Sequence, residues 1–262
     1  MSRQVLKEMK SSKFKKKYKA IIFDVDGTLI PNKEDGMPSE NVKKAILKAS
    51  KKIKISIATS RSLPHAIHII DSLSINSPVI LNGGTMIWDP RKKSIIWEKN
   101  ISNKKYREIV SILKDEKIKA FANRGNDDIE IEKLPASYIP QQIWIGKITK
   151  RKAEKLRSRL EAVKMIIPHF VPSWTNGLVD VIITHSEATK LHGILEISKF
   201  LKVKSENIIG VGDGYNDFPL LMACGLKIAM GNAVPDLKAI ADYVAPSVDD
   251  DGVADVIEKF VL

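Results

Sequence analysis

The feature that most constrains this chain is an alternation of short apolar runs with segments of helical period. The runs AIIFDV, KISIAT, SPVILN, VDVIIT, NIIGVGD, KIAMG and YVAP are typical of buried strands, and segments such as SENVKKAILKASKK and TKLHGILEISKFL are typical of helices. Strands that alternate with helices predict a parallel sheet covered on both faces. We therefore expect an α/β fold with a Rossmann-like, doubly wound sheet, whose ligands bind beyond the carboxyl ends of the strands.

The middle of the chain follows a different order. Strand-like pieces such as KAFANR and QIWIGKIT surround two helical stretches, so that strand, helix, strand occurs twice. This order predicts an inserted α+β unit with its own sheet. We expect a basic, flexible leader at residues 1–17, a core made of residues 18–84 and 179–262, and the insert at residues 85–178.

Charge and cysteine content restrict the partners and the compartment. The formal net charge is +12, and the excess of Lys and Arg lies in residues 1–20 and 86–178, whereas residues 179–262 are acidic on balance. A basic insert on an acidic core indicates that the insert faces an anion. No run approaches the roughly 20 apolar residues of a membrane span, and the start of the chain has no apolar signal segment. Because Cys224 is the single cysteine, no intramolecular disulfide forms, and we expect a cytoplasmic protein without a membrane partner.

Two aspartates follow the first apolar run, in FDVDGT. Side chains two positions apart in an extended segment share a face, so Asp24 and Asp26 project together while Val25 points away. At ~4 Å two like charges repel by roughly 4 kcal/mol at an effective dielectric near 20, which favours a bound divalent metal. Oxygen ligands and a phosphate substrate indicate magnesium. A plain turn is the alternative, because Asp and Gly27 also favour turns.

A second acidic motif that contains glycine, GVGDGYND, follows a later apolar run. It supplies Asp213 and Asp217, although a turn that caps the next helix is again the alternative. Thr59 in IATSR and Lys190 in EATKLHGI can bind phosphate oxygens through a strand-end hydroxyl and an ammonium. Each is unremarkable alone, but two acidic strand ends in one predicted parallel sheet favour a common site.

The ordered set DVDGT, ATSR, Lys190 and GDGYND resembles the four motifs of the haloacid dehalogenase superfamily. The insert resembles the cap of its Cof-like, type IIB phosphatases, LNGGTMI resembles the passage from core to cap, and the segment GNAVPDLKAIADYVAPSVDDDGVADVI resembles the family's closing segment. The likeness runs from about Tyr18 to the C-terminus. It implies a magnesium-dependent phosphatase for small phosphate monoesters such as sugar phosphates. In that reading Asp24 forms a phospho-aspartate and Asp26 acts as general acid and base.

The resemblance also implies which residues bind the ligands. The implied magnesium ligands are Asp24, the backbone carbonyl of Asp26 and Asp213, with Asp217 in a supporting role. The implied phosphate and substrate ligands are Gly27, Thr59, Ser60, Arg61, Asn82, Gly83, Lys190 and Asn216. The sequence departs from the family pattern at Ser60 and Leu191, where glycine is common. Neither departure removes a catalytic group.

Other functions remain open at this point. Related caps serve sugar phosphomutases. The basic leader and insert would suit a nucleic-acid-binding protein, but basic and aromatic residues do not interleave regularly, which argues against nucleic acid as a partner. The four tryptophans lie in or beside the insert, where packing inside the cap is favoured over stacking on a substrate: Trp88, Trp97, Trp144 and Trp174. The physiological substrate and the oligomeric state have no readable signal.

Overall fold

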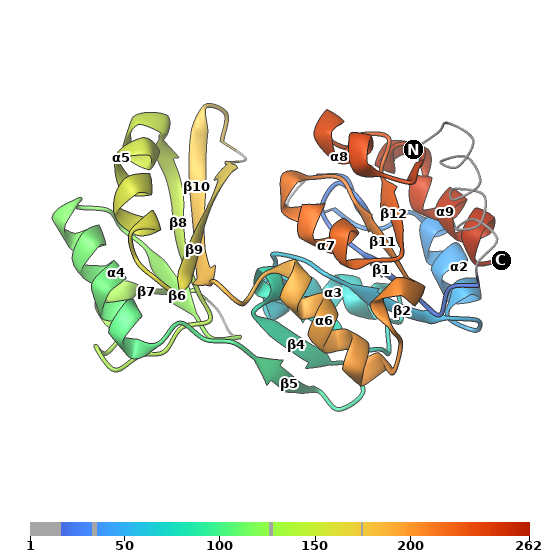
Figure 1. Cartoon of the computed structure of the whole chain (residues 1–262), viewed down its shortest axis with the longest axis horizontal. Coiled ribbons are helices and arrows are strands. Elements are labelled where there is room, and N and C mark those ends of the chain that lie inside the picture. Colours follow the sequence, from blue (N-terminus) through green and yellow to red (C-terminus); the bar gives the residue numbers. More distant parts are fainter. Residues whose placement is uncertain (1–16, 33–35, 126–127, 174) are drawn as a thin grey trace, which may run out of the picture.

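A five-stranded parallel sheet organises one half of the computed structural model, which describes residues 17–32, 36–125, 128–173 and 175–262 (Figure 1). The strand order is β13-β12-β11-β1-β2. The strands are β1 (Ala20–Phe23), β2 (Lys54–Ile57), β11 (Ile208–Gly212), β12 (Leu226–Ala229) and β13 (Tyr243–Val244). The predicted basic leader, apart from Lys17, lies outside the described residues, as does Trp174.

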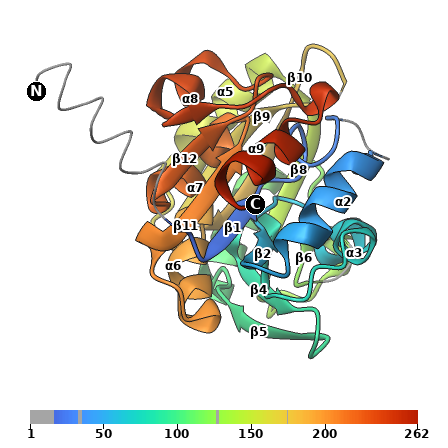
Figure 2. The ribbon, with the colours of Figure 1, turned by 90° about the vertical axis from the view of Figure 1, so that its right-hand side faces the viewer.

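Helices cover both faces of this sheet. On one face α2 (Glu40–Ala49) packs against α9 (Gly252–Phe260), and on the other α6 (Lys190–Leu201) packs against α7 (Phe218–Ala223). Figure 2 shows α9 and α2 in front of the strands. The remaining helices of this half are α3 (Leu63–Ser72) and α8 (Pro235–Ile240). Because strands β1 and β11 are buried along their whole length, they need apolar side chains on both faces, as their sequences show. The predicted α/β fold is confirmed.

Local signals set where several helices begin. The Ser39 side chain accepts a hydrogen bond from the backbone N–H of Val42 at the start of α2, and proline occupies the first turn of α3, α7 and α8. Short 3-10 turns connect other elements: η1 (Asn82–Gly84), η2 (Ile131–Lys133), η3 (Ser205–Asn207), η4 (Tyr215–Asp217) and η5 (Val248–Asp250). None of the helices in the described ranges has both the length and the apolar character needed to cross a membrane.

A small antiparallel sheet extends the edge of the parallel one. Strand β3 (Val79–Leu81) meets β2 through a parallel bridge between Ala58 and Ile80, and then pairs with β4 (Met86–Asp89), which pairs with β5 (Ser94–Glu98). The buried residues of β4 belong to the same apolar core as the parallel sheet. This sheet therefore belongs structurally with the first half of the molecule.

The second half is an antiparallel sheet with helices on one face (Figure 1). Its strand order is β7-β6-β8-β10-β9, and it has an apolar core of its own. The strands are β6 (Phe121–Asn123), β7 (Ile129–Glu130), β8 (Gln142–Thr149), β9 (Ile166–Pro172) and β10 (Leu178–His185). The helices are α4 (Asn103–Asp115) and α5 (Lys150–Glu161). This α+β unit interrupts the core, as the sequence predicted.

The boundaries between the core and the inserted unit differ from those expected from the sequence. The run VDVIIT, expected in the parallel sheet, lies in β10 and pairs with β8 and β9 of the second sheet. Conversely, residues 86–98 lie in β4 and β5, beside the first core. An apolar run indicates burial without indicating its partner strands, so periodicity could not place either segment. The passages between the two halves lie near residues 99 and 185.

Candidate active site

The order of the parallel sheet reverses between β1 and β11, because the chain continues from β1 to β2 on one side and returns to β11 on the other. Asp24 follows β1 and Asp213 follows β11, and the backbone N–H of Asp24 donates to the carbonyl of Val211 at 2.9 Å. Parallel strands present their carboxyl ends at one edge, so both aspartates lie at the same switch point. This is where an open α/β sheet binds ligands.

Three carboxylates and one ammonium meet at this point. One oxygen from each of Asp24, Asp213 and Asp217 lies within 4.8 Å of the others. Lys190, the first residue of α6, donates from Nζ to Asp24 Oδ1 and to Asp217 Oδ1, both at 2.5 Å. The lysine is only 2% exposed, so these charges interact in a poorly hydrated environment. The structure thus brings together residues 24, 190, 213 and 217.

Within this cluster both carboxylate oxygens of Asp217 accept hydrogen bonds from the protein. Its Oδ2 accepts the backbone N–H groups of Asp213 and Gly214 at 3.0 and 2.9 Å, while its Oδ1 accepts from Lys190. It is completely buried. Asp217 therefore fixes the turn that carries Asp213 and orients the lysine, which leaves Asp24 and Asp213 as the carboxylates with more freedom to bind a ligand.

The electrostatics of the cluster suit a divalent cation. Burial, followed by repulsion from Asp217, raises the pKa of Asp24 well above its usual range, although Lys190 acts in the opposite direction. Burial and Asp217 likewise raise the pKa of Asp213 to about 7. When ionised, three carboxylates face one ammonium, and a hard cation with oxygen ligands would neutralise the excess negative charge that otherwise raises these pKa values. The residues present fit magnesium.

The carboxylate of Asp213 is held by residues from two other segments. Thr28 donates from Oγ1 to Asp213 Oδ1 at 3.1 Å. Asn232 donates to the carbonyl of Gly27 at 2.8 Å and approaches Asp213 Oδ2 at 3.5 Å. Gly27 has a positive φ of 78°, and a Cβ at this position would overlap the Asp213 carboxylate. The role of Asn232 was not predicted, and its only sequence signal is the GNAVPD segment.

Asp26 is not one of the three clustered carboxylates and pairs with Arg61. The guanidinium donates from Nη2 to Asp26 Oδ1 at 2.7 Å and from Nε to Oδ2 at 3.0 Å, a bidentate contact. The Asp26 side chain is 26% exposed and that of Arg61 is 10% exposed. Arg61 thus orients a carboxylate beside Asp24, a contact that the sequence did not predict.

The loop after β2 presents the predicted phosphate ligands. Thr59 is buried, and its Oγ1 accepts the backbone N–H of Arg61 at 3.1 Å, which leaves the hydroxyl proton available to a ligand. The N–H of Gly83 donates to the Thr59 carbonyl at 2.9 Å and so ties η1 to this loop. Ser60 is half-buried in the same loop, and Asn216 is exposed within the second acidic motif, directly before Asp217.

Asn82 has a different role from the one predicted. Its side chain is completely buried and donates to Asn123 Oδ1 at 3.2 Å and to Gln141 Oε1 at 2.9 Å, both in the second half of the molecule. Gln141 in turn donates to Glu98, which accepts from Arg124 at 2.8 Å. Because the Asn82 amide N–H groups are used in this polar joint, its side chain connects the two halves and does not point an N–H donor at phosphate.

Comparison with known proteins agrees with this geometry. The family model for haloacid dehalogenase-like hydrolases matches residues 21–167 and 137–257. The 5-amino-6-(5-phospho-D-ribitylamino)uracil phosphatase YcsE of Bacillus subtilis is 28% identical, with 93% of this chain and 96% of that protein covered. Phosphoglycolate phosphatase 1 of Saccharolobus solfataricus is 24% identical, with 93% and 96% covered. The chloroplastic endoribonuclease YBEY of Arabidopsis thaliana is 25% identical over 95% of this chain, which spans only 47% of that protein.

Solved structures share the fold along nearly the whole chain. BT1666 of Bacteroides thetaiotaomicron, a phosphatase of the haloalkanoate (HAD) superfamily, superposes with a TM-score of 0.77 at 23% identity, with 93% of this chain and 95% of that chain covered. The HAD subclass IIB sugar phosphatase BT4131 gives a TM-score of 0.76 at 22% identity, with 92% and 98% covered. The resemblance seen in the motifs is confirmed, and the chain belongs to the haloacid dehalogenase-like hydrolase family.

Proposed function

We propose that the protein is a magnesium-dependent phosphatase that hydrolyses small phosphate monoesters through a phospho-aspartate on Asp24. The observation that carries the proposal is the meeting of Asp24, Asp213 and Asp217 around Lys190 at the switch point of the sheet. Relatives over nearly the whole chain are named as phosphatases of phosphorylated metabolites, among them a phospho-ribityl uracil and phosphoglycolate. These names support the reaction class more than any one substrate.

Asp24 is the nucleophile in this scheme. One carboxylate oxygen attacks phosphorus, the bond from phosphorus to the ester oxygen breaks, and Asp26 gives a proton to the departing alcohol. Asp26 then takes a proton from water as that water attacks the phospho-aspartate, which releases inorganic phosphate and restores Asp24. The bidentate contact of Arg61 holds the Asp26 carboxylate on the side of the crevice from which it can act.

The charges of the substrate require compensation at the same place. Asp24 and Asp213 would hold the magnesium ion together with the backbone carbonyl of Asp26, and the ion supplies positive charge that lets a carboxylate approach a phosphate. Lys190 and the hydroxyl of Thr59 bind phosphate oxygens, supported by Gly27, Ser60, Gly83 and Asn216 around the crevice. Asp217 positions the turn of Asp213 and the Lys190 ammonium.

The second sheet with α4 and α5 acts as a cap over this site. The polar joint formed by Asn82, Asn123 and Gln141 connects the cap directly to the loop that carries Thr59. Closure of a cap excludes water and completes the contacts to a substrate. Cys224 is free and buried, which is consistent with a cytoplasmic enzyme.

Release of inorganic phosphate from p-nitrophenyl phosphate tests the proposal. We expect turnover that requires magnesium, is abolished by EDTA and falls at least about 1,000-fold in Asp24→Asn, because the nucleophile is removed. Asp71→Asn, an exposed position on α3, is the matched control and should keep wild-type turnover. Undiminished turnover in Asp24→Asn, or conversion of hexose phosphates to an isomeric ester without free phosphate, would contradict it.

A further inference from the structure

The cap sheet carries a row of large side chains on the face opposite to its helices. Phe121 in β6, Trp144 in β8, Ile182 in β10 and His169 in β9 are directly paired across the four neighbouring strands. All four are half-buried, and none belongs to the apolar core that joins the sheet to α4 and α5. This row, termed the cap platform, is large and mostly apolar across these four strands, and it continues into β7 with the acidic Glu130, which pairs with Phe121.

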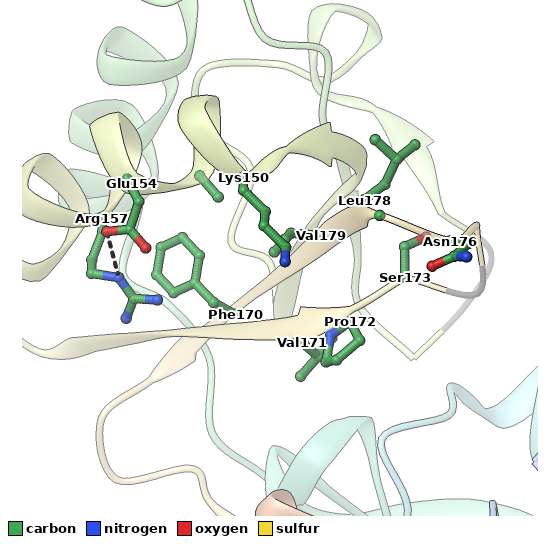
Figure 3. A pocket seen from close by; sticks show the side chains of 12 residues that line it. Lys150, Glu154, Arg157, Phe170, Val171, Pro172, Ser173, Asn176, Leu178 and Val179 are labelled. Atoms are coloured by element: carbon green, nitrogen blue, oxygen red, sulfur yellow. Dashed lines mark ion pairs between the residues drawn. The ribbon is translucent and has the colours of Figure 1, made fainter.

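The cap platform faces the core half of the molecule. In Figure 1, α4 and α5 lie on the outer side of the cap sheet and the core lies on its other side. Asn123, two residues after Phe121 and so on the same face, accepts the hydrogen bond from Asn82 of the core. In contrast, Phe170, which follows His169, points to α5, where the Arg157 guanidinium lies 4.0 Å from its ring centroid (Figure 3).

The place of the platform relative to the catalytic loop follows from strand geometry. The pair of Phe121 and Trp144 lies two residues along the strands from Asn123, which is a separation of about 7 Å. Asn82, which Asn123 contacts, is tied through its backbone N–H to the carbonyl of Arg61 at 3.0 Å. The platform therefore lies one side-chain row beyond the contact that joins the cap to the loop of Thr59.

The tryptophan is held with its ring along the sheet. A Cβ at Gly146, two residues further along β8, would overlap the six-membered ring of Trp144, so the glycine is what leaves room for this rotamer. Phe121 flanks the same ring with centroids 5.5 Å apart at an interplanar angle of 37°. The indole is therefore held along the sheet over Gly146, with the Phe121 ring beside it.

We propose, on the basis of the phosphatase function above, that the cap platform binds a planar aromatic or heteroaromatic ring in the leaving group of the substrate. A flat π-surface selects a flat partner, because stacking requires close contact over the whole ring. The row continues into Glu130 of β7, whose negative charge disfavours a second phosphate or a carboxylate at this position. A substrate of this class carries its phosphate on a short linker, with the ring at the far end.

Two substrates with matched chemistry test this proposal. Benzyl phosphate and cyclohexylmethyl phosphate both release a primary alcohol and differ mainly in whether the ring is planar. Wild type should show a kcat/KM for benzyl phosphate roughly three- to tenfold higher, as expected for one aromatic stacking contact. Trp144→Leu should bring the ratio close to one, and Gly146→Ala, which displaces the ring without removing it, should lower the ratio as well.

Phe170→Leu is the matched control, because this residue lies on the same sheet but on the helix face. Phe170→Leu should keep the wild-type ratio of kcat/KM values for the two esters, even where the substitution lowers the stability of the cap. Equal kcat/KM values for the two esters in wild type, or an unchanged ratio in Trp144→Leu, would overturn the platform while leaving the phosphatase proposal intact. Failure to release phosphate from either ester and from p-nitrophenyl phosphate would instead refute the phosphatase proposal.

Discussion

Replacing Lys190 by methionine should destabilise the core strongly, and the structure gives the size of the effect. The ammonium makes two hydrogen bonds at 2.5 Å, to Asp24 and Asp217, and is 2% exposed. Burial lowers the pKa of Lys190, but the two carboxylates outweigh this effect and raise the pKa above its ordinary value. The lysine is therefore charged. Removing one partner of a buried ion pair costs about 3–5 kcal/mol, because the remaining charge stays buried without compensation.

Urea denaturation followed by circular dichroism measures this loss of unfolding free energy. The matched control is Lys199→Met on the same helix, where an exposed lysine pairs with Glu196 and with no other acid of the described residues, and the cost should stay below about 1 kcal/mol. In EDTA we expect Lys190→Met to lose about 3–5 kcal/mol, and magnesium to restore part of it by neutralising the unpaired carboxylates. If Lys190→Met in EDTA were no less stable than Lys199→Met, the buried charge cluster would not exist as described.

Two further predictions concern the joint and the acidic cluster. Gln141→Leu should cost about 1–3 kcal/mol in a urea titration, because it leaves one buried N–H of the Asn82 amide without its acceptor and removes one donor from the Glu98 carboxylate, while the contacts of Asn82 with Asn123 and of Glu98 with Arg124 remain; an unchanged midpoint would refute the joint. Since the pKa of Asp213 is raised to about 7, the folded metal-free protein retains a proton that the unfolded chain releases near pH 4. In EDTA the stability of wild type relative to Asp213→Asn should therefore fall as the pH rises from about 4 to 7, and a constant difference between the two would contradict this.

The sequence was sufficient to predict the fold class and that the acidic motifs lie at one edge of the sheet. Asp24 and Asp213 each follow a buried strand, and in a parallel sheet all such ends lie at one edge. That β1 and β11 are neighbours, so that the two carboxylates meet, is seen only in the strand order. Lys190 was harder to single out, because one lysine among many has no distinguishing local pattern. Its assignment rested on the family resemblance.

Other features depend on tertiary contacts that leave no local pattern. The side chain of Asn82 was expected at the phosphate, but contacts from residues 41 and 59 positions away direct it into the joint. The run in β10 had the apolar character of a core strand, and only its pairing with β8 and β9 shows where it belongs. Trp144 was expected inside the cap, whereas its strand register places it on the open face.

Calorimetric titration of magnesium into the wild-type protein, Asp24→Asn and Asp213→Asn tests the central claim most directly. That claim is that carboxylates from two adjacent strand ends hold one divalent cation where phosphate is cleaved. We expect one magnesium ion per chain, and an affinity at least about tenfold weaker in either variant, since each removes a charged ligand. Wild-type affinity in both variants, or no saturable binding to the wild-type protein, would contradict the claim.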